Sequence, residues 1–250
     1  MFVKEVPDVA QLRIDPGSRE PKLEGLPTKV NDFDKNAVEE AVRLKEKASG
    51  STITVFSVKG KKLKETVKEP LAMGADSAVV VPFDGALDGR GTATILAKAV
   101  EKHGPFDVVF AGEVSLDVNA GEVTARAAAL LGMEFVWNAK EVKAVDDGSI
   151  TLVRDADEDE EVKVPFPVLV TMNDEMNNPR LPALMQILAA GKKPITEESL
   201  DSLGLSVDDL KPVATLLSNK APKTERKHVI FSGEDREEKL VEALKQEGII

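Results

Sequence analysis

The 250-residue sequence contains no cysteine, only two histidines, and no run of about 18 apolar residues. The absence of cysteine excludes disulfide bonds, thiolate nucleophiles and cysteine-ligated zinc or iron–sulfur centres in this chain. The histidines, His103 and His228, lie far apart without a catalytic motif around them, so we expect surface or linker positions for both. Without a long apolar run, no segment is expected to insert into a membrane.

Positive charge is also scarce, since 33 Lys and Arg face 44 Asp and Glu and the formal net charge is −11. This charge disfavours nucleic acid as a partner, because such binding needs a basic surface. The first residues, Met1–Glu5, lack the apolar region of a signal peptide and are too acidic for a transit peptide, so a cytoplasmic location is expected. The length suits one large α/β domain with an appendage.

Short β-rich segments alternate with helical patterns over most of the sequence. Most of these segments are continuous apolar runs, which suits strands that are buried on both faces of a parallel sheet. We expect strands at Phe2–Val6, Ile53–Val58, Ala78–Val81, Val108–Ala111 and Val168–Met172. Helices are expected from Asp32, from Lys61 to Met73 with a kink or early end at Pro70, from Gly91 to Lys102, and from Ala120 to Leu131. The alternation predicts an α/β fold with an open, mostly parallel, doubly wound sheet.

The pattern changes after Trp137. Lys140–Val145 and Ser149–Arg154 are expected to form a hairpin, because Asp146-Asp147-Gly148 is a turn sequence. The acidic run Asp155–Glu161 that follows is interpreted as a solvated turn.

The last fifty or so residues contain few apolar side chains. Ser218–Lys227 is typical of a linker, and Asp235–Gln246 of a terminal amphipathic helix. So little apolar surface does not form a core alone. We therefore divide the chain into an α/β domain at 1–196 and an extended C-terminal arm at 197–250 that packs on something else.

Two strand–loop–helix junctions are suited to a nucleotide. One is Lys59-Gly60-Lys61, and the other is Gly112–Asp117. Glycine lets a backbone approach a phosphate, and a helix N-terminus offers unpaired N–H donors. Asp117 could accept a hydrogen bond from a ribose hydroxyl or cap the next helix. Taken alone, each junction fits an ordinary strand-to-helix turn better, because no glycine-rich dinucleotide fingerprint or P-loop consensus is present.

Six groups of residues, in order along nearly the whole chain, carry a resemblance to a known family. They are Val3–Asp8; Asn31-Asp32 with Glu40–Lys45; Glu65–Val67 with Leu71–Asp76; Arg154, the acidic run and Pro165–Thr171; Asn178–Arg180 through Lys192–Ile195; and Ser232–Glu234 through Gly248–Ile250. Together they resemble the electron transfer flavoprotein beta (small) subunit family. Six matches in the right order make chance a poor explanation.

The resemblance implies an adenine-nucleotide-hydrolase-like α/β fold without hydrolase chemistry, because Val6-Pro7-Asp8 lacks the Ser-Gly-Gly-x-Asp-Ser loop of the ATP-using relatives. It implies an electron carrier subunit rather than an enzyme, paired with a larger alpha subunit that holds FAD. The small subunit of such a heterodimer holds AMP in simple members and a second FAD in members that carry out electron bifurcation. A stand-alone adenine-nucleotide-binding regulatory domain of related fold is the alternative, and an ATP-using ligase or hydrolase is disfavoured.

The resemblance also implies which residues contact the nucleotide. They are Val6, Pro7, Asp8, Asn31, Asp32 and Ser57, and in the main loop Asp117, Asn119, Gly121, Glu122, Val123 and Thr124. Many family members have Gln at the position of Glu122 and Gly at that of Thr124. Gly121 and Val123 favour FAD over AMP, whereas Glu122 matches neither pattern, and a carboxylate repels a pyrophosphate unless it points away.

The family docks partner dehydrogenases through a leucine on a recognition loop. The spacing from Asn178-Pro179-Arg180 assigns this role to Leu184. The alternative is that Leu184 begins a core-facing helix stripe with Ile187 and Leu188.

Overall fold

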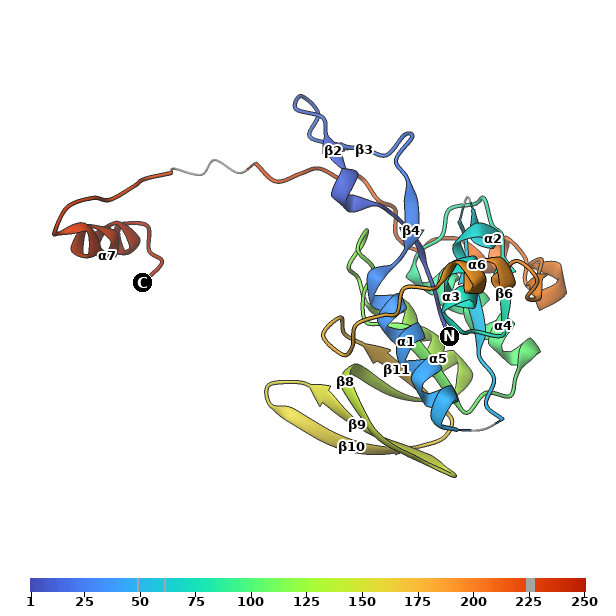
Figure 1. Ribbon diagram of the computed structural model, residues 1–250. Helices are drawn as coiled ribbons and strands as arrows, with labels where there is room; N and C mark the ends of the chain where they lie inside the picture. The colour runs from blue at the N-terminus through green and yellow to red at the C-terminus, as the bar shows by residue number, and fades with distance from the viewer. Residues whose placement is uncertain (49, 61, 224–227) are drawn as a thin grey trace. The chain divides into compact units, whose positions relative to one another are not determined.

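The computed structural model describes residues 1–48, 50–60, 62–223 and 228–250. Figure 1 shows the chain and labels most of its helices and strands. Contacts between residues group the chain into two compact units. The first unit is Met1–Arg13 with Lys22–Ser218, and the second is Ile14–Pro21 with Asn219–Ile250. The division at residue 196 between an α/β domain and an arm stays a prediction, although contacts within the chain group residues as far as Ser218 with the α/β unit.

The first unit is built on parallel strands in two sheets that the first three residues connect. Phe56 N donates to Met1 O at 2.7 Å, and Val3 N donates to Phe56 O at 2.9 Å. On the other side Phe2 N donates to Phe110 O, also at 2.9 Å. The resulting order is β12-β6-β5, the first residues, and then β7-β11-β8-β9-β10. The parallel strands are β12 (Ile195–Glu197), β6 (Ser77–Val81), β5 (Thr54–Val58), β7 (Val108–Gly112), β11 (Val168–Met172) and β8 (Glu134–Asp146).

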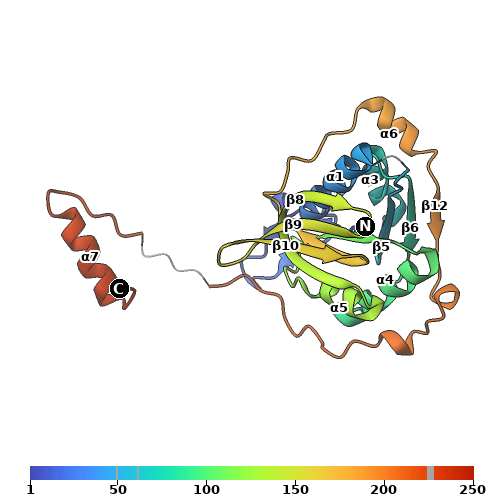
Figure 2. The same cartoon turned by 90° about the horizontal axis from the view of Figure 1, so that it is seen from below.

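Helices cover both faces of this sheet because the side chains of each strand alternate between two cores. Val55 and Phe110 belong to one core, whereas Phe56 and Val109 belong to the other. Figure 2 shows α1 and α3 on one side of the strands and α4 and α5 on the other. The predicted doubly wound α/β class is therefore confirmed. The helices are α1 (Asp32–Lys47), α2 (Leu63–Thr66), α3 (Lys68–Met73), α4 (Gly89–His103) and α5 (Glu122–Leu131).

The helix predicted around Pro70 is present in two pieces, α2 and α3, with Val67 between them. Proline has no N–H, so Pro70 cannot donate to the carbonyl of Thr66 and the ladder of hydrogen bonds is interrupted there. Lys61, where this helix was expected to begin, lies outside the described residues. The predicted strand Phe2–Val6 has different partners along its length. Phe2 bridges β5, whereas β1 (Glu5–Pro7) pairs antiparallel with β4 (Thr28–Val30).

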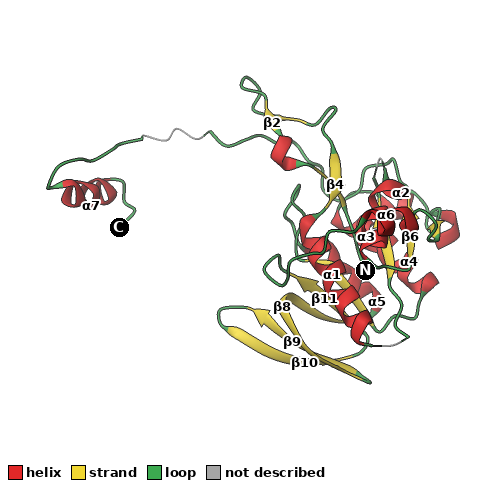
Figure 3. Cartoon of the chain, viewed as in Figure 1, coloured by secondary structure: helices red, strands yellow, loops and turns green. Residues whose placement is uncertain are grey.

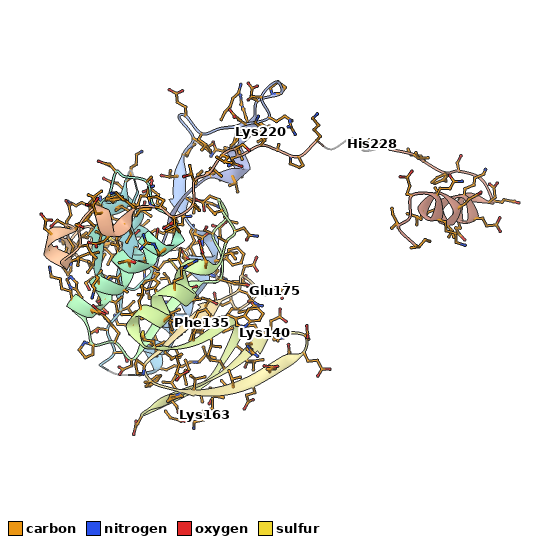
Figure 4. All side chains as sticks on the ribbon, turned by 180° about the vertical axis from the view of Figure 1, so that it is seen from behind. Phe135, Lys140, Lys163, Glu175, Lys220 and His228 are labelled. Atoms are coloured by element: carbon orange, nitrogen blue, oxygen red, sulfur yellow. The ribbon has the colours of Figure 1, made fainter. Side chains whose placement is uncertain are left out.

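The predicted hairpin is part of a three-stranded antiparallel meander, which Figure 3 shows in yellow. It consists of β8, β9 (Ser149–Asp155) and β10 (Asp159–Pro165). The interpretation of the whole acidic run as a turn is wrong, because its last residues begin β10. Cations on the neighbouring strands offset its charge: Arg154 Nε lies 2.7 Å from Glu160 Oε2, and Lys140 pairs with Asp159. Figure 4 shows Lys140 and Lys163 on this meander.

The segment after β11 crosses to the other edge of the sheet through α6 (Leu184–Ala190) and β12. Two short 3-10 turns follow, η2 (Asp201–Leu203) and η3 (Asp208–Leu210). Leu203, Leu205 and Leu210 are buried in the core that includes α4. The first part of the expected arm therefore packs on its own chain.

The second unit contains the predicted terminal helix, α7 (Arg236–Gln246), which has no buried residue. Arg19 and Ala221 are joined within this unit, since Ala221 N donates to Arg19 O at 2.8 Å and Arg19 Nη1 donates to Ala221 O at 3.0 Å. Residues 224–227 of the predicted linker lie outside the described residues. The short strands β2 (Arg13–Ile14) and β3 (Pro21–Lys22) pair with each other. In the described ranges no helix has the length and apolar character that crossing a membrane requires.

Candidate functional site

A cavity of about 610 Å³ opens at the carboxyl ends of the central strands. Its walls come from residues 2–5, from the ends of β5 and β7, and from the first turns of α1, α4 and α5. Residues 1–3 have β5 on one side and β7 on the other, so the cavity lies where the order of the strands reverses. Open α/β sheets bind ligands at such a point, and the volume is typical of a small-molecule site.

The first turn of α5 faces the cavity with unused hydrogen-bond donors. Gly121 precedes the helix in the left-handed region at φ 64°, and no side chain caps the helix there. The N–H groups of a helix's first turn have no partner within the helix. Together with the helix dipole they favour an anion such as a phosphate. Val123 and Thr124 in this turn line the cavity.

Lys4 is a cation of the cavity wall, which Lys59 of the predicted Lys59-Gly60-Lys61 junction also lines, and sequence reasoning did not identify Lys4 as a site residue. Its Nζ lies 2.7 Å from Asp117 Oδ1 and 3.1 Å from Ser115 Oγ. Lys4 lies between residues 1–3 and β1, and Ser115 and Asp117 belong to the loop between β7 and α5. The only available signal was the place of Lys4 directly after the buried pair Phe2-Val3, at the carboxyl end of a strand.

Two buried side chains of α1's entry hold the loops around the cavity. Asn31 donates to Val114 O at 2.8 Å and accepts from Leu116 N at 3.1 Å, so its amide fixes the loop before Asp117. Asp34 accepts from the backbone N–H of Lys4 at 2.7 Å and from that of Gly112 at 3.0 Å.

The environment of Asp34 also sets its charge. Burial raises the pKa of Asp34 to about 6, and the backbone donors of Lys4 and Gly112 oppose that rise. Gly112 has to lack a side chain, because a Cβ there would lie 2.5 Å from Asp34 Oδ1 and 2.8 Å from Asp34 N. Glycine therefore allows β7 and the start of α1 to approach each other here.

The carboxylates of the wall are largely engaged by the chain itself. The carboxylate of Glu122 would repel a bound phosphate if it pointed toward it. Its Oε2 lies 3.0 Å from Nε and 2.9 Å from Nη2 of Arg126 on the same helix. It packs against Gly89, where a side chain would collide with it. Burial, with Asp155 and Asp174 nearby, raises the pKa of Glu113. Hydrogen bonds or ion pairs within the chain also occupy Glu5, Asp34, Asp88 and Asp117.

The structure brings six of the twelve residues expected at the nucleotide together in the cavity wall: Asn31, Asp117, Gly121, Glu122, Val123 and Thr124. The other six lie outside this wall, and their contacts stay predictions. Asp8 caps the turn η1 (Val9–Gln11), Asp32 pairs with Lys29 at 2.6 Å, and Ser57 is buried with no hydrogen-bond partner among the described residues. Val6 is fully buried. Pro7 and Asn119 do not line the cavity.

Sequence reasoning also missed the apolar part of the wall. Val58, Leu96 and Ala111 contribute from β5, α4 and β7. Ala214 and Leu216 contribute from the segment that was assigned to the arm. That segment is fastened to α4, because Val213 N donates to Asp88 Oδ2 at 2.9 Å. No local sequence pattern distinguishes these residues from ordinary core or linker residues.

Leu184 is the first residue of α6 and is 71% exposed. Met185, Ile187 and Leu188 of this helix are exposed as well, and Ala190 is its buried residue. The alternative in which Leu184 begins a core-facing stripe therefore does not hold within this chain. A docking role for Leu184 stays a prediction.

Fold and cavity together define an α/β protein of the doubly wound class with a ligand cavity at the switch point. The family model described as "Electron transfer flavoprotein domain" matches residues 23–203. The chain is 36% identical to the "Electron transfer flavoprotein subunit beta" of Thermoanaerobacterium thermosaccharolyticum, over 100% of this chain and 98% of that protein. The chain belongs to the electron transfer flavoprotein beta-subunit family, as its resemblance implied.

Two further relatives extend the comparison. The chain is 35% identical to the protein of the same name from Clostridium acetobutylicum, over 96% of this chain and 92% of that protein. It is 32% identical to the "Caffeyl-CoA reductase-Etf complex subunit CarD" of Acetobacterium woodii, over 81% of this chain and 78% of that protein.

Proposed function

We propose that this chain is the beta subunit of a heterodimeric electron transfer flavoprotein in the cytoplasm and that it binds an adenine nucleotide in the cavity at the switch point. In this role it is an electron carrier subunit and has no complete active site of its own. The observation that carries the proposal is the meeting of the uncapped α5 N-terminus and Lys4 in one cavity at the carboxyl ends of the strands.

The residues of the cavity fit the parts of such a nucleotide. The first turn of α5 and Lys4 suit the phosphates, and Asp117 suits a ribose hydroxyl. The apolar wall, with Val58 and Leu96, suits an adenine ring. A bound flavin would supply the redox chemistry, and the chain would hold it, orient it and limit its access to water.

We propose FAD, rather than AMP, as the nucleotide of this subunit. Gly121 and Val123 follow the pattern of the members that hold a second flavin. The ion pair of Glu122 with Arg126 turns the carboxylate along its own helix, which weakens the objection from its charge. One relative belongs by name to a caffeyl-CoA reductase–Etf complex, and this supports a role in flavin-based electron bifurcation.

Counting the nucleotides tests this choice. The heterodimer, co-expressed with its larger subunit, is purified and denatured, and the released nucleotides are separated and quantified. The proposal expects two FAD per heterodimer, one from each subunit. One FAD with one AMP would overturn the FAD assignment and leave the cavity as the site. No nucleotide beyond the single FAD of the larger subunit would overturn the site itself.

We propose that the second unit packs on the larger alpha subunit. Its helix α7 has no buried residue, and Leu240, Val241 and Ile249 are exposed. An obligate contact should bury more than the roughly 1,600 Å² of a standard interface. A chain that ends at Ser218 should keep the core of the first unit and lose the larger subunit on size-exclusion chromatography. Retention of a 1:1 complex by this shorter chain would overturn the assignment.

We also propose that Leu184 docks partner dehydrogenases, which deliver electrons to the heterodimer. An exposed apolar side chain at the start of an exposed helix is a suitable anchor for a transient contact.

A further inference from the structure

The segment that leads from β11 to α6, residues 173–183, is fastened along α1. Asn36 Nδ2 donates to Asn177 O at 2.7 Å and to Asp174 O at 3.2 Å. Asn177 Nδ2 returns a hydrogen bond to Asn36 O at 3.1 Å. Asn36 is 4% exposed, whereas Asn177 is half-buried and Asp174 exposed, so these bonds are partly buried. The backbone of an otherwise irregular segment is thereby held at its first half.

Arg180 fastens the second half of the segment with both sides of its guanidinium. Its Nε lies 2.8 Å and its Nη2 3.1 Å from the two carboxylate oxygens of Glu39. Its Nη1 lies 2.6 Å and its Nη2 3.2 Å from those of Glu46. The backbone N–H of Arg180 also donates to Glu39 Oε2 at 3.0 Å. Two carboxylates of one helix thus hold a planar fork, an arrangement that a single-point cation does not reproduce.

The receiving residues form one stripe of α1. Asn36, Glu39 and Glu46 are three and seven positions apart, so they share one face of the helix. Asn36 and Glu39 are buried, and a buried polar group is costly unless it is hydrogen-bonded. Burial opposes ionisation of Glu39, but the hydrogen bonds from Arg180 and Arg43 outweigh it and lower its pKa to about 2. Glu39 therefore stays ionised and keeps its hold on Arg180 at neutral pH.

We infer that Arg180 is a positioning residue for docking and that its fork, held by Glu39 and Glu46, presents the exposed apolar surface at the start of α6 in a fixed orientation. This inference rests on the proposed docking role of Leu184, which follows Arg180 by four positions. Leu181, the residue after Arg180, is 92% exposed. The exposed apolar surface therefore begins directly after the residue that the two carboxylates hold. An anchor that is already ordered loses less conformational freedom on docking.

The variants are chosen to loosen the fork while a cation stays at position 180. Arg180→Lys keeps a cation and loses the bidentate geometry. Glu46→Gln removes the exposed half of the clamp and leaves Glu39 paired, so it stays informative if Arg180→Lys folds poorly. Arg43→Lys is the matched control, because Arg43 also bonds Glu39, at 2.8 Å, and its other carboxylate neighbour, Glu40, lies on the same helix.

The experiment uses the purified heterodimer and, as probe, the dehydrogenase from the same cells that reduces the wild-type heterodimer. The rate of flavin reduction is followed as the dehydrogenase concentration is varied. Arg180→Lys and Glu46→Gln should each raise KM for the dehydrogenase, the former by about tenfold. They should leave kcat, nucleotide content and melting temperature close to wild type. Arg43→Lys should leave KM unchanged.

A double variant decides whether Arg180 acts through Leu184. If it does, Arg180→Lys should add little to the KM of Leu184→Ala, because there is no anchor left to position. Multiplied effects would overturn the positioning role, as would an unchanged KM in both Arg180→Lys and Glu46→Gln. If Leu184→Ala itself leaves KM unchanged, the docking proposal fails and the positioning role fails with it. A KM raised by Leu184→Ala alone overturns only the role of Arg180.

Discussion

Lys4 Nζ and Asp117 Oδ1 lie 2.7 Å apart and join the segment before β1 to the loop between β7 and α5. The pair is part of the cavity wall, and neither side chain is fully buried. A phosphate bound at the α5 N-terminus would share Lys4 with Asp117. The two residues therefore have opposite electrostatic effects on the same anion.

Replacing the two residues singly and together should reveal that opposition. We expect Lys4→Met to reduce nucleotide retention most, because the charge of Asp117 is left without its cation beside the phosphates. Asp117→Ala should weaken retention less, through loss of a ribose acceptor, and the double variant should fall between them. Nucleotide per heterodimer after gel filtration measures the effect. Wild-type retention in all three variants would remove both residues from the site.

Gly112→Ala should destabilise the fold through overpacking. The added Cβ would lie 2.6 Å from Phe33 Cβ and 2.8 Å from the backbone N of Asp34, so backbone has to move. Overpacking of this kind costs about 1–3 kcal/mol in the free energy of unfolding. Gly148→Ala is the control, since a Cβ there meets nothing within 4 Å, and it should stay within about 0.5 kcal/mol of wild type. Urea denaturation measures both. Equal free energies of unfolding for Gly112→Ala and Gly148→Ala would show that α1 can move away from the added Cβ without loss of stability.

Asp34 should make stability depend on pH in a specific direction. Its pKa is raised from the usual 3.8 to about 6 by burial, so between these values the folded chain keeps a proton that the unfolded chain has released. Protonation then favours folding, and this stability is lost as pH rises through about 6. The difference between 3.8 and about 6 corresponds to about 3 kcal/mol.

The comparison with Asp34→Asn isolates this effect, because asparagine does not titrate. The free energy of unfolding of the wild type, minus that of Asp34→Asn, should fall by about 2 kcal/mol between pH 4 and pH 7, since the unfolded chain already loses part of this proton below pH 4. Denaturant titrations at several pH values provide it. A difference that rises with pH instead would mean that the N–H donors of Lys4 and Gly112 outweigh burial.

Local sequence was enough to predict the alternation of strands and helices because each buried strand is apolar on both faces. Ser77–Val81 and Val168–Met172 show this most clearly, since their burial is nearly continuous. The strand β10 was missed because its first residues are acidic, and their partners Arg154 and Lys140 lie on the other two strands of the meander. The packing of Leu203 and Leu210 was missed for the same reason, since their partners lie on α4.

The candidate site was only half visible in the sequence. The loop residues from Asp117 to Thr124 follow one another in the chain, so a resemblance found them together. Lys4 precedes Asp117 by 113 residues and Leu216 follows Thr124 by 92 residues, so only the folded chain brings them to this loop. Sequence reasoning weighed the charge of Glu122 without its partner Arg126, which lies one helical turn further on.

Leu184→Ala should separate docking from stability. The side chain is exposed, so its removal creates no cavity and should leave the melting temperature and nucleotide content nearly unchanged. Burying a leucine side chain against a partner contributes roughly 1.5–3 kcal/mol, and each 1.4 kcal/mol is about tenfold in affinity. Flavin reduction at sub-saturating dehydrogenase should therefore slow by roughly tenfold to over a hundredfold.

The opposite pattern is expected from a leucine in the core. Leu169 is fully buried in β11, and Leu169→Ala should lower the free energy of unfolding by about 2–5 kcal/mol through the cavity that it leaves. If Leu184→Ala behaves like Leu169→Ala in thermal denaturation, the larger subunit covers Leu184 in the heterodimer. If reduction keeps its wild-type rate while stability is unchanged, a different part of the surface receives the dehydrogenase. Only a slower reduction at unchanged stability agrees with an exposed anchor.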